Sequence, residues 1–152
     1  MRQILFSIYL AGLFVGLSSC CTKKDCDGFD SLNEIQLLNF SASEVDSIAL
    51  EIFESNSNFT NRIDSSFTSA HDRSGGVTEF IIFMNENINK SHAYKITLIS
   101  TGQVYKVTSF ETSGETCNSC FPYHPSSDYF NVLNSYSING QKQNNSSLTI
   151  SK

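Results

Sequence analysis

Beyond residue 32, apolar side chains recur at every second position, and this spacing limits the possible folds more than any other feature. In the stretch DSIALEIFE (46–54), Ile48, Leu50 and Ile52 fall on one face of an extended segment, and the residues between them fall on the other. An amphipathic helix needs a period near 3.6, whereas a half-buried strand needs a period of two. The sequence therefore predicts β-structure.

The stretch AYKITLISTGQVYKVTSF (93–110) is predicted to form a β-hairpin. Thr101-Gly102 is a candidate two-residue turn, in which glycine supplies a positive φ at no steric cost. Pairing outward from this turn sets Ile99 opposite Val104 and Leu98 opposite Tyr105. Apolar pairs then share one face and Lys/Thr pairs share the other. A slip of one residue would bury lysine, so the pattern determines which face is buried.

Four further segments have strand patterns: 34–40, 78–85, 128–140 and 146–152. Segment 78–85 is apolar on both faces, which favours an interior strand. Segment 128–140 ends at an Asn139-Gly140 turn, although a short helix over 128–136 is an alternative. About seven short strands, separated by Asn, Ser and Gly clusters, predict an all-β domain over residues 32–152. The expected architecture is an antiparallel β-sandwich, immunoglobulin-like or similar, with a small barrel as the alternative.

The first nineteen residues have the organisation of a cleaved secretory signal. Met1-Arg2-Gln3 is basic, the uncharged run ILFSIYLAGLFVGL follows over 4–17, and Ser18-Ser19 are small. The apolar run is 14 residues long, and a membrane-spanning helix needs about 20. An uncleaved anchor or a buried core helix is the alternative.

The stretch LSSC (17–20) resembles a bacterial lipobox. The resemblance implies that the signal is cleaved after Ser19 and that Cys20 receives a diacylglycerol, with Cys21 a poorer candidate for lipidation. Two or three acyl chains hold a protein firmly to a membrane, since each buried methylene contributes about 0.8 kcal/mol. Residues 20–31 are expected to form a polar tether, similar to the Lys- and Asp-containing segments of lipoproteins in Bacteroidota.

Four cysteines remain once Cys20 is acylated: Cys21, Cys26, Cys117 and Cys120. Export places them in an oxidising compartment, which favours structural disulfides. Four thiols allow three connectivities, and a bond from Cys26 to Cys117 or Cys120 is favoured because it ties the start of the domain to a distant loop. The Cys-x-x-Cys spacing at 117–120 also leaves a thiol redox site or a zinc site open.

Apart from the Cys-x-x-Cys pair, no motif in the sequence points to an enzyme, a metal site or a bound cofactor. The formal net charge is −5 and basic residues form no run, which argues against a nucleic-acid partner. Tyr123, Tyr129 and Phe130 are candidates for an aromatic ligand patch. Ser31 and Ser47, in the triplets DSL and DSI, resemble the acceptors in Asp-Ser/Thr-aliphatic sites that Bacteroidota O-glycosylate.

As a whole, the leader, the lipobox and the Asn/Ser-rich β-domain resemble small exported lipoproteins of Bacteroidota. The resemblance implies a non-enzymatic protein held on the outer membrane by Cys20, facing the periplasm or the surface. Its domain would have a binding or structural role with a protein or glycan partner. The alternatives are a thiol-disulfide redox or metal-binding protein that uses Cys117 and Cys120, and a surface carbohydrate- or peptide-binding module.

Overall fold

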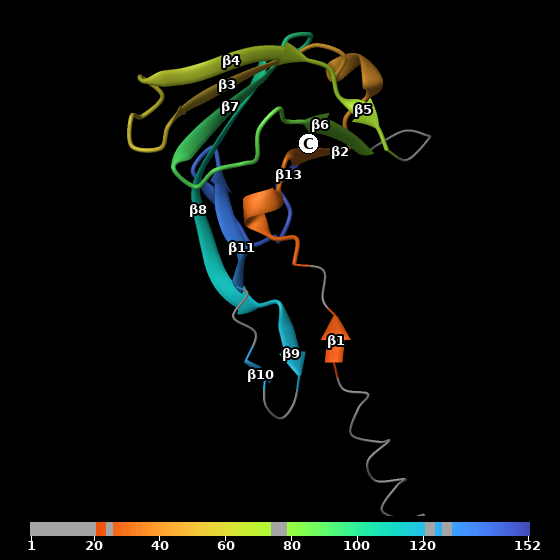
Figure 1. Cartoon of the computed structure of the whole chain (residues 1–152). Helices are drawn as coiled ribbons and strands as arrows, with labels where there is room; N and C mark the ends of the chain where they lie inside the picture. The colour runs from red at the N-terminus through yellow and green to blue at the C-terminus, as the bar shows by residue number, and fades with distance from the viewer. Residues whose placement is uncertain (1–20, 24–25, 74–78, 121–123, 126–128) are drawn as a thin grey trace, which may run out of the picture. The chain divides into compact units, whose positions relative to one another are not determined.

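The computed structural model describes residues 21–23, 26–73, 79–120, 124–125 and 129–152 (Figure 1). Helix in these residues is limited to two short 3-10 turns, η1 (Phe29–Ser31) and η2 (Ala42–Glu44). The chain divides into two compact units. The smaller contains Met1–Cys26 and Glu115–Phe130, and the larger contains Asp27–Gly114 and Asn131–Lys152.

The larger sheet is six-stranded, in the order β12-β11-β8-β7-β3-β4 (Figure 1). Its strands are β3 (Ile48–Glu54), β4 (Arg62–Thr68), β7 (His92–Leu98), β8 (Gln103–Thr116), β11 (Tyr129–Ile138) and β12 (Gln141–Gln143). β3 runs antiparallel to both of its neighbours, as do β8 to β7 and β12 to β11.

The second sheet is four-stranded, in the order β13-β2-β6-β5. Its strands are β2 (Glu34–Leu38), β5 (His71–Asp72), β6 (Glu79–Phe83) and β13 (Thr149–Ser151). β6 runs antiparallel to β2 and β5, whereas the C-terminal β13 runs parallel to β2 and forms the edge. The interior position expected for segment 78–85 is confirmed, since β6 lies between two strands and Phe80, Ile81 and Ile82 are buried.

A single hydrophobic core joins the two sheets. Ile35, Leu37, Ile82 and Ile150 come from the four-stranded sheet, and Ile48, Leu50, Tyr94, Ile96, Leu98, Val107, Leu133 and Tyr136 come from the six-stranded sheet. Every one of these side chains is at most 4% exposed. The chain is therefore all-β and consistent with a β-sandwich, as the period-two pattern predicts.

The smaller unit contains a three-stranded antiparallel sheet in the order β1-β9-β10. Its strands are β1 (Cys21–Lys23), β9 (Asn118–Cys120) and β10 (His124–Pro125). The segment expected as a polar tether, 20–31, thus includes a strand and the η1 turn.

The hairpin over 93–110 is present, but its predicted register is wrong by two residues. Leu98 pairs with Gln103 and Ile96 pairs with Tyr105, so the connection contains four residues rather than two. Gly102, at φ 71°, donates its N–H to the Leu98 carbonyl at 2.8 Å and closes the longer turn. The Ile99 N–H bonds to the carbonyl of Ser47 at 2.9 Å, which continues the antiparallel pairing of β7 with β3. A shift of two preserves the faces, so the residues predicted to be buried are correctly assigned.

The two sheets contain six and four strands, which is more than the approximately seven strands expected from the sequence. β4 has no apolar alternation, and five of its seven residues are exposed. It pairs with β3 as the edge of the six-stranded sheet. The helix considered for 128–136 does not form, because that stretch lies in β11, which ends at a turn where Asn139 and Gly140 have φ values of 50° and 82°.

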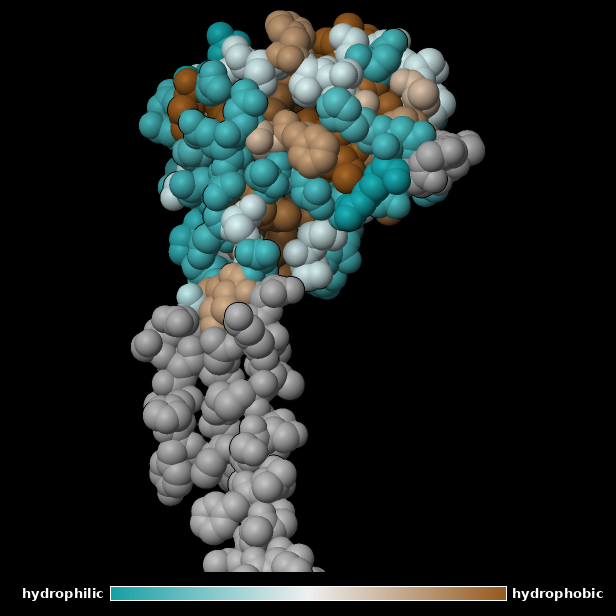
Figure 2. Space-filling model, turned by 45° about the vertical axis from the view of Figure 1, so that its right-hand side comes forward, coloured by the Kyte–Doolittle hydropathy of each residue, from teal (hydrophilic) through white to brown (hydrophobic). Residues whose placement is uncertain are grey.

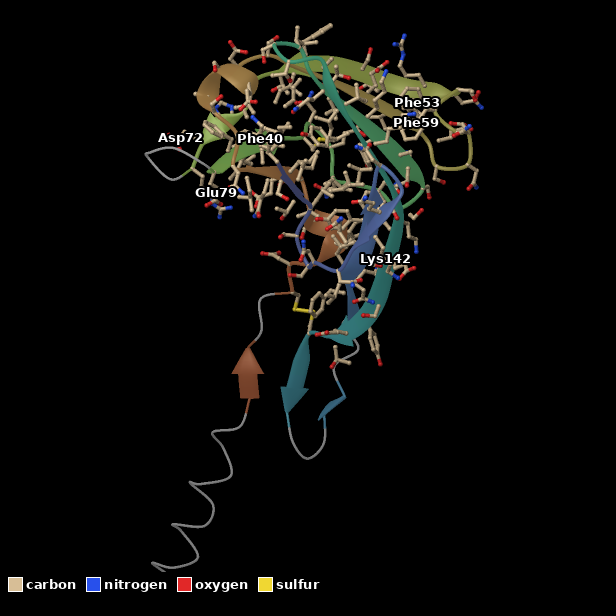
Figure 3. The ribbon with its side chains drawn as sticks, turned by 180° about the vertical axis from the view of Figure 1, so that it is seen from behind. Phe40, Phe53, Phe59, Asp72, Glu79 and Lys142 are labelled. Carbon is tan, nitrogen blue, oxygen red and sulfur yellow. A yellow bond between two sulfur atoms is a disulfide. The ribbon has the colours of Figure 1, made fainter. Side chains whose placement is uncertain are left out.

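One aromatic pair lies apart from the core cluster. Phe53 on β3 is 5% exposed and packs edge-on against Phe59, with 5.3 Å between ring centroids (Figure 3). The Lys106 ammonium lies 5.1 Å from the Phe59 ring centroid, at cation–π distance. Other large apolar side chains are exposed on the larger unit, including Phe67 at 81%, and Figure 2 shows hydrophobic surface between polar residues.

The Tyr136 hydroxyl fastens the edge of one sheet to the other sheet. It donates to the carbonyl of Thr149 at 2.9 Å and accepts the Thr149 N–H at 2.8 Å. The parallel ladder uses the alternate residues of β13, since Gln36 N–H bonds to the carbonyl of Leu148 and Lys152 N–H to that of Leu38. The backbone groups of Thr149 therefore point to the free edge, where Tyr136 satisfies both.

We predict that Tyr136→Phe destabilises the protein by about 1–3 kcal/mol, because it leaves the N–H and C=O of Thr149 without their partner. The ring and its packing stay, so the change isolates the hydroxyl. The matched control is Tyr129→Phe, at a site 70% exposed. Urea denaturation monitored by circular dichroism measures both variants. Equal midpoints for the two would contradict the assigned role of the hydroxyl.

Candidate functional site

The structure joins Cys26 to Cys117 by a disulfide between residues 91 positions apart, with their Cα atoms 5.3 Å apart (Figure 3). This selects one of the two partners expected for Cys26. Closing so long a loop contributes roughly 4–5 kcal/mol in the chain-entropy account. Disulfides persist in oxidising compartments, so the bond fits an exported protein.

Cys21 and Cys120 occupy paired positions in the small sheet. Antiparallel pairing of β1 with β9 sets Cys21 opposite Cys120. The Cys-x-x-Cys pair is therefore divided, because Cys117 is bonded to Cys26 and Cys120 lies opposite Cys21. Cys20, expected to carry lipid, lies outside the described residues.

The structure describes two of the three aromatic residues proposed as a ligand patch. Tyr129 is 70% exposed at the start of β11, and the adjacent Phe130 is half-buried. Tyr123 lies outside the described residues. Of the two candidate glycosylation serines, Ser31 is exposed in η1 and its hydroxyl donates to the carbonyl of Gly28 at 2.8 Å. Ser47 is half-buried just before β3.

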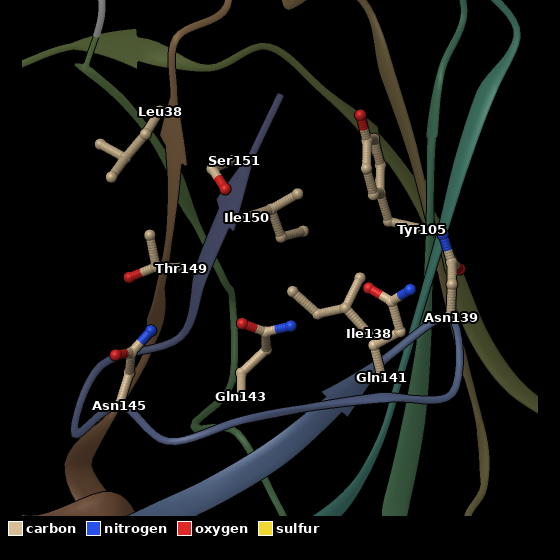
Figure 4. A pocket seen from close by; sticks show the side chains of 10 residues that line it. All are labelled: Leu38, Tyr105, Ile138, Asn139, Gln141, Gln143, Asn145, Thr149, Ile150 and Ser151. Atoms are coloured by element: carbon tan, nitrogen blue, oxygen red, sulfur yellow. The ribbon is translucent and has the colours of Figure 1, made fainter.

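A hollow of about 460 Å³ opens where the edges of the two sheets meet (Figure 4). β2 and β13 line one side, and β8, β11, β12 and the loop after β12 line the other. The lining residues are uncharged: Leu38, Tyr105, Ile138, Asn139, Gln141, Gln143, Asn145, Thr149, Ile150 and Ser151. Sequence patterns missed this site, because its polar residues belong to Asn/Gln/Ser stretches that are typical of turns.

Tyr105 is held firmly at the wall of the hollow. Its ring packs edge-on against the buried Phe40, with 6.0 Å between centroids, and its hydroxyl donates to Oε1 of Gln103 at 3.0 Å. Burial is the main cause that raises the pKa of Tyr105, and the nearby negative charge of Glu44 raises it further. The hydroxyl therefore stays neutral near pH 7.

The amides around the hollow fall into two groups. Asn139 is fixed, because its Oδ1 accepts the Lys106 N–H at 2.8 Å and its Nδ2 donates to the carbonyl of Val104 at 3.3 Å. The side chains of Gln141, Gln143 and Asn145 make no hydrogen bond to any other residue that the structure describes. Each offers a donor and an acceptor to a ligand.

An ion pair stands next to this site. Lys152, which follows Ser151, donates from Nζ to Oε1 of Glu44 at 2.6 Å. That hydrogen bond is the main cause that lowers the pKa of Glu44 to about 2, and the backbone N–H and hydroxyl of Ser41 add to the effect. The pair ties the end of β13 to η2.

Comparison with known proteins finds no matching family model, no matching curated protein and no matching solved structure. Within the described ranges, none of the helices has the length and apolar character to cross a membrane. The same residues contain no group of three or more His, Cys, Asp or Glu side chains that could hold a metal ion.

The lowered pKa of Glu44 predicts that this carboxylate stabilises the fold above pH 4.5 and loses that contribution as the pH falls toward 2. Lys152→Met should raise the pKa of Glu44 toward 4.5 and flatten the acid-side decline in stability. Carbon-detected NMR titration of the Glu44 carboxyl measures the pKa directly. Lys90→Met, at an exposed lysine, is the control. An unchanged Glu44 titration in Lys152→Met would contradict the ion-pair assignment.

Proposed function

We propose that this chain is an exported cell-envelope protein that is anchored by lipid on Cys20 and is not an enzyme. Its two-sheet unit binds an uncharged, hydroxyl-rich ligand, of which a neutral saccharide is the natural class. The observation that carries the binding role is the uncharged hollow, with an ordered tyrosine and three side-chain amides that have no partner among the described residues.

The chemistry of the lining favours a saccharide over a charged or purely apolar ligand. Vicinal sugar hydroxyls donate and accept hydrogen bonds at once, and Gln and Asn amides carry both functions on one planar group. The Tyr105 ring and Ile138 supply apolar surface beside these amides, as the non-polar faces of a sugar ring require. An anionic ligand would find no cation in the lining. The volume of about 460 Å³ lies within the usual range for small-molecule sites.

We expect the full chain to bind soluble neutral oligosaccharides in a panel of glucose-, mannose- and galactose-based chains. Replacement of both Gln141 and Gln143 by alanine should weaken binding by tenfold or more, because each lost hydrogen bond costs about 1 kcal/mol. Isothermal titration calorimetry measures the change. The control is Asn85→Ala, an exposed amide after β6, which should leave affinity unchanged.

Two outcomes would contradict the saccharide proposal. One is binding of acidic glycans in preference to neutral ones. The other is neutral-glycan binding that the double alanine variant does not weaken, which would place the site elsewhere on the chain.

The lipid-anchor part of the proposal is supported by three features that agree. The basic and apolar leader directs export, and LSSC places a cysteine directly after two small residues. The Cys26–Cys117 disulfide fits an oxidising compartment. A permanent anchor would hold the two-sheet unit at the membrane, where its hollow could bind glycans.

Metabolic labelling with palmitate tests the anchor. The full chain produced in a lipoprotein-processing bacterium should incorporate label, and Cys20→Ala should abolish incorporation and leave the leader attached. Cys21→Ala is the matched control and should be labelled like the unaltered chain. Equal labelling of the Cys20→Ala protein would refute the assignment of the anchor.

A further inference from the structure

We infer that Cys21 and Cys120 form a second disulfide, one residue after the proposed lipid anchor. The observation is a register: in the antiparallel pair of β1 with β9, Cys21 is opposite Cys120, Thr22 is opposite Ser119, and Lys23 is opposite Asn118. Three consecutive pairs define this register, so strand pairing, and not a chance approach of two loops, sets the two cysteines opposite each other.

Directly opposed residues in an antiparallel ladder meet the distance requirement of a disulfide. Their Cα atoms lie about 4.5 or 5.5 Å apart, depending on whether the pair is hydrogen-bonded. Disulfides span Cα separations of about 4.4–6.8 Å. No backbone movement is therefore needed to join these two residues.

The competing pairings are removed by the first disulfide. Cys117 is already bonded to Cys26, so Cys120 cannot pair with its Cys-x-x-Cys neighbour. Cys26 is likewise unavailable to Cys21. With Cys20 acylated, Cys21 and Cys120 are the two thiols that remain, and the small sheet sets them opposite each other.

The bond forms by oxidation with a balanced exchange. Each thiol loses its proton, a sulfur–sulfur bond forms, and two electrons pass to a disulfide-bearing oxidant of the thiol–disulfide exchange class. That oxidant leaves as a dithiol. The oxidising compartment implied by Cys26–Cys117 is the setting in which such oxidants act.

The second disulfide has a consequence that rests on the proposed anchor. With Cys21 covalently joined to β9, the lipid-bearing Cys20 directly precedes a residue that is cross-linked to the small sheet. The lipid would then be attached close to that sheet and not at the end of a long flexible segment. Three-residue strand pairs are weak alone, so the bond would hold β1 against β9 together with the Cys26–Cys117 disulfide.

Peptide mapping of the full chain tests the inference. The protein is extracted from membranes in detergent, alkylated with iodoacetamide without reductant, and digested with trypsin. The fragment CCTK (20–23) should remain linked to the fragment 107–142, which contains both Cys117 and Cys120. In the Cys26→Ser/Cys117→Ser double variant this link should persist. Cys120 is then the sole cysteine of its fragment, so the link is assigned to Cys120. In Cys120→Ser, Cys21 should be recovered alkylated.

The outcomes separate this inference from the lipid proposal. Fragment spectra of CCTK report lipid on Cys20 and the bond on Cys21 independently. Alkylated Cys21 and Cys120 in the unreduced, unaltered chain would overturn the second disulfide whatever the state of Cys20. A bond at Cys20 instead of Cys21 would overturn both.

Discussion

The position of the edge strand β13 depends on one buried hydroxyl, that of Tyr136. β13 is an edge strand of only three residues, and the parallel ladder to β2 uses the backbone groups of alternate residues, which leaves those of Thr149 and Ser151 directed away from β2. The Tyr136 hydroxyl takes both remaining groups of Thr149, and its ring is fully buried beside Phe110. An unpaired edge is a site for unwanted strand addition. This contact blocks part of that edge and fixes the position of β13 relative to β11.

The same contact holds one wall of the hollow, since Thr149 lines it. Thr149, Ile150 and Ser151 form one wall, and Ile138, Gln141 and Gln143 form the other. Tyr136 lies two residues before Ile138 on β11 and its hydroxyl bonds to Thr149 in the opposite wall, so the position of that wall relative to the amides is fixed. A binding site built from short edge strands would otherwise lose affinity to the cost of ordering them. The ion pair of Lys152 with Glu44 holds the far end of β13.

The sequence predicts the faces of the strands better than their connections. Alternation in 46–54 and 93–110 identifies most of the buried residues, because the face of a strand depends on parity. Phe53 is an exception: it is 5% exposed although it has the parity of the outer face, and it follows the irregularity in the register after Ile52. The hairpin register was wrong because Thr101-Gly102 fits a two-residue or a longer turn, and the structure closes the longer one through the bond from the Gly102 N–H to the Leu98 carbonyl. β4 was missed because an exposed edge strand needs no apolar alternation. The hollow was missed because its residues are ordinary turn formers that converge from positions between 38 and 151. The sequence limited the partner of Cys26 to two cysteines, and the structure selects Cys117, because the fold brings these two residues together across 91 positions.

Amide hydrogen exchange tests the fastening of β13 most directly. Thr149 and Ser151 have the same parity on this strand, so both N–H groups point to the free edge. Only the Thr149 N–H has a partner there among the described residues, which is the Tyr136 hydroxyl. Thr149 should exchange slowly, near the rate of global unfolding, while Ser151 exchanges quickly. Equal and rapid exchange at both amides would contradict the account.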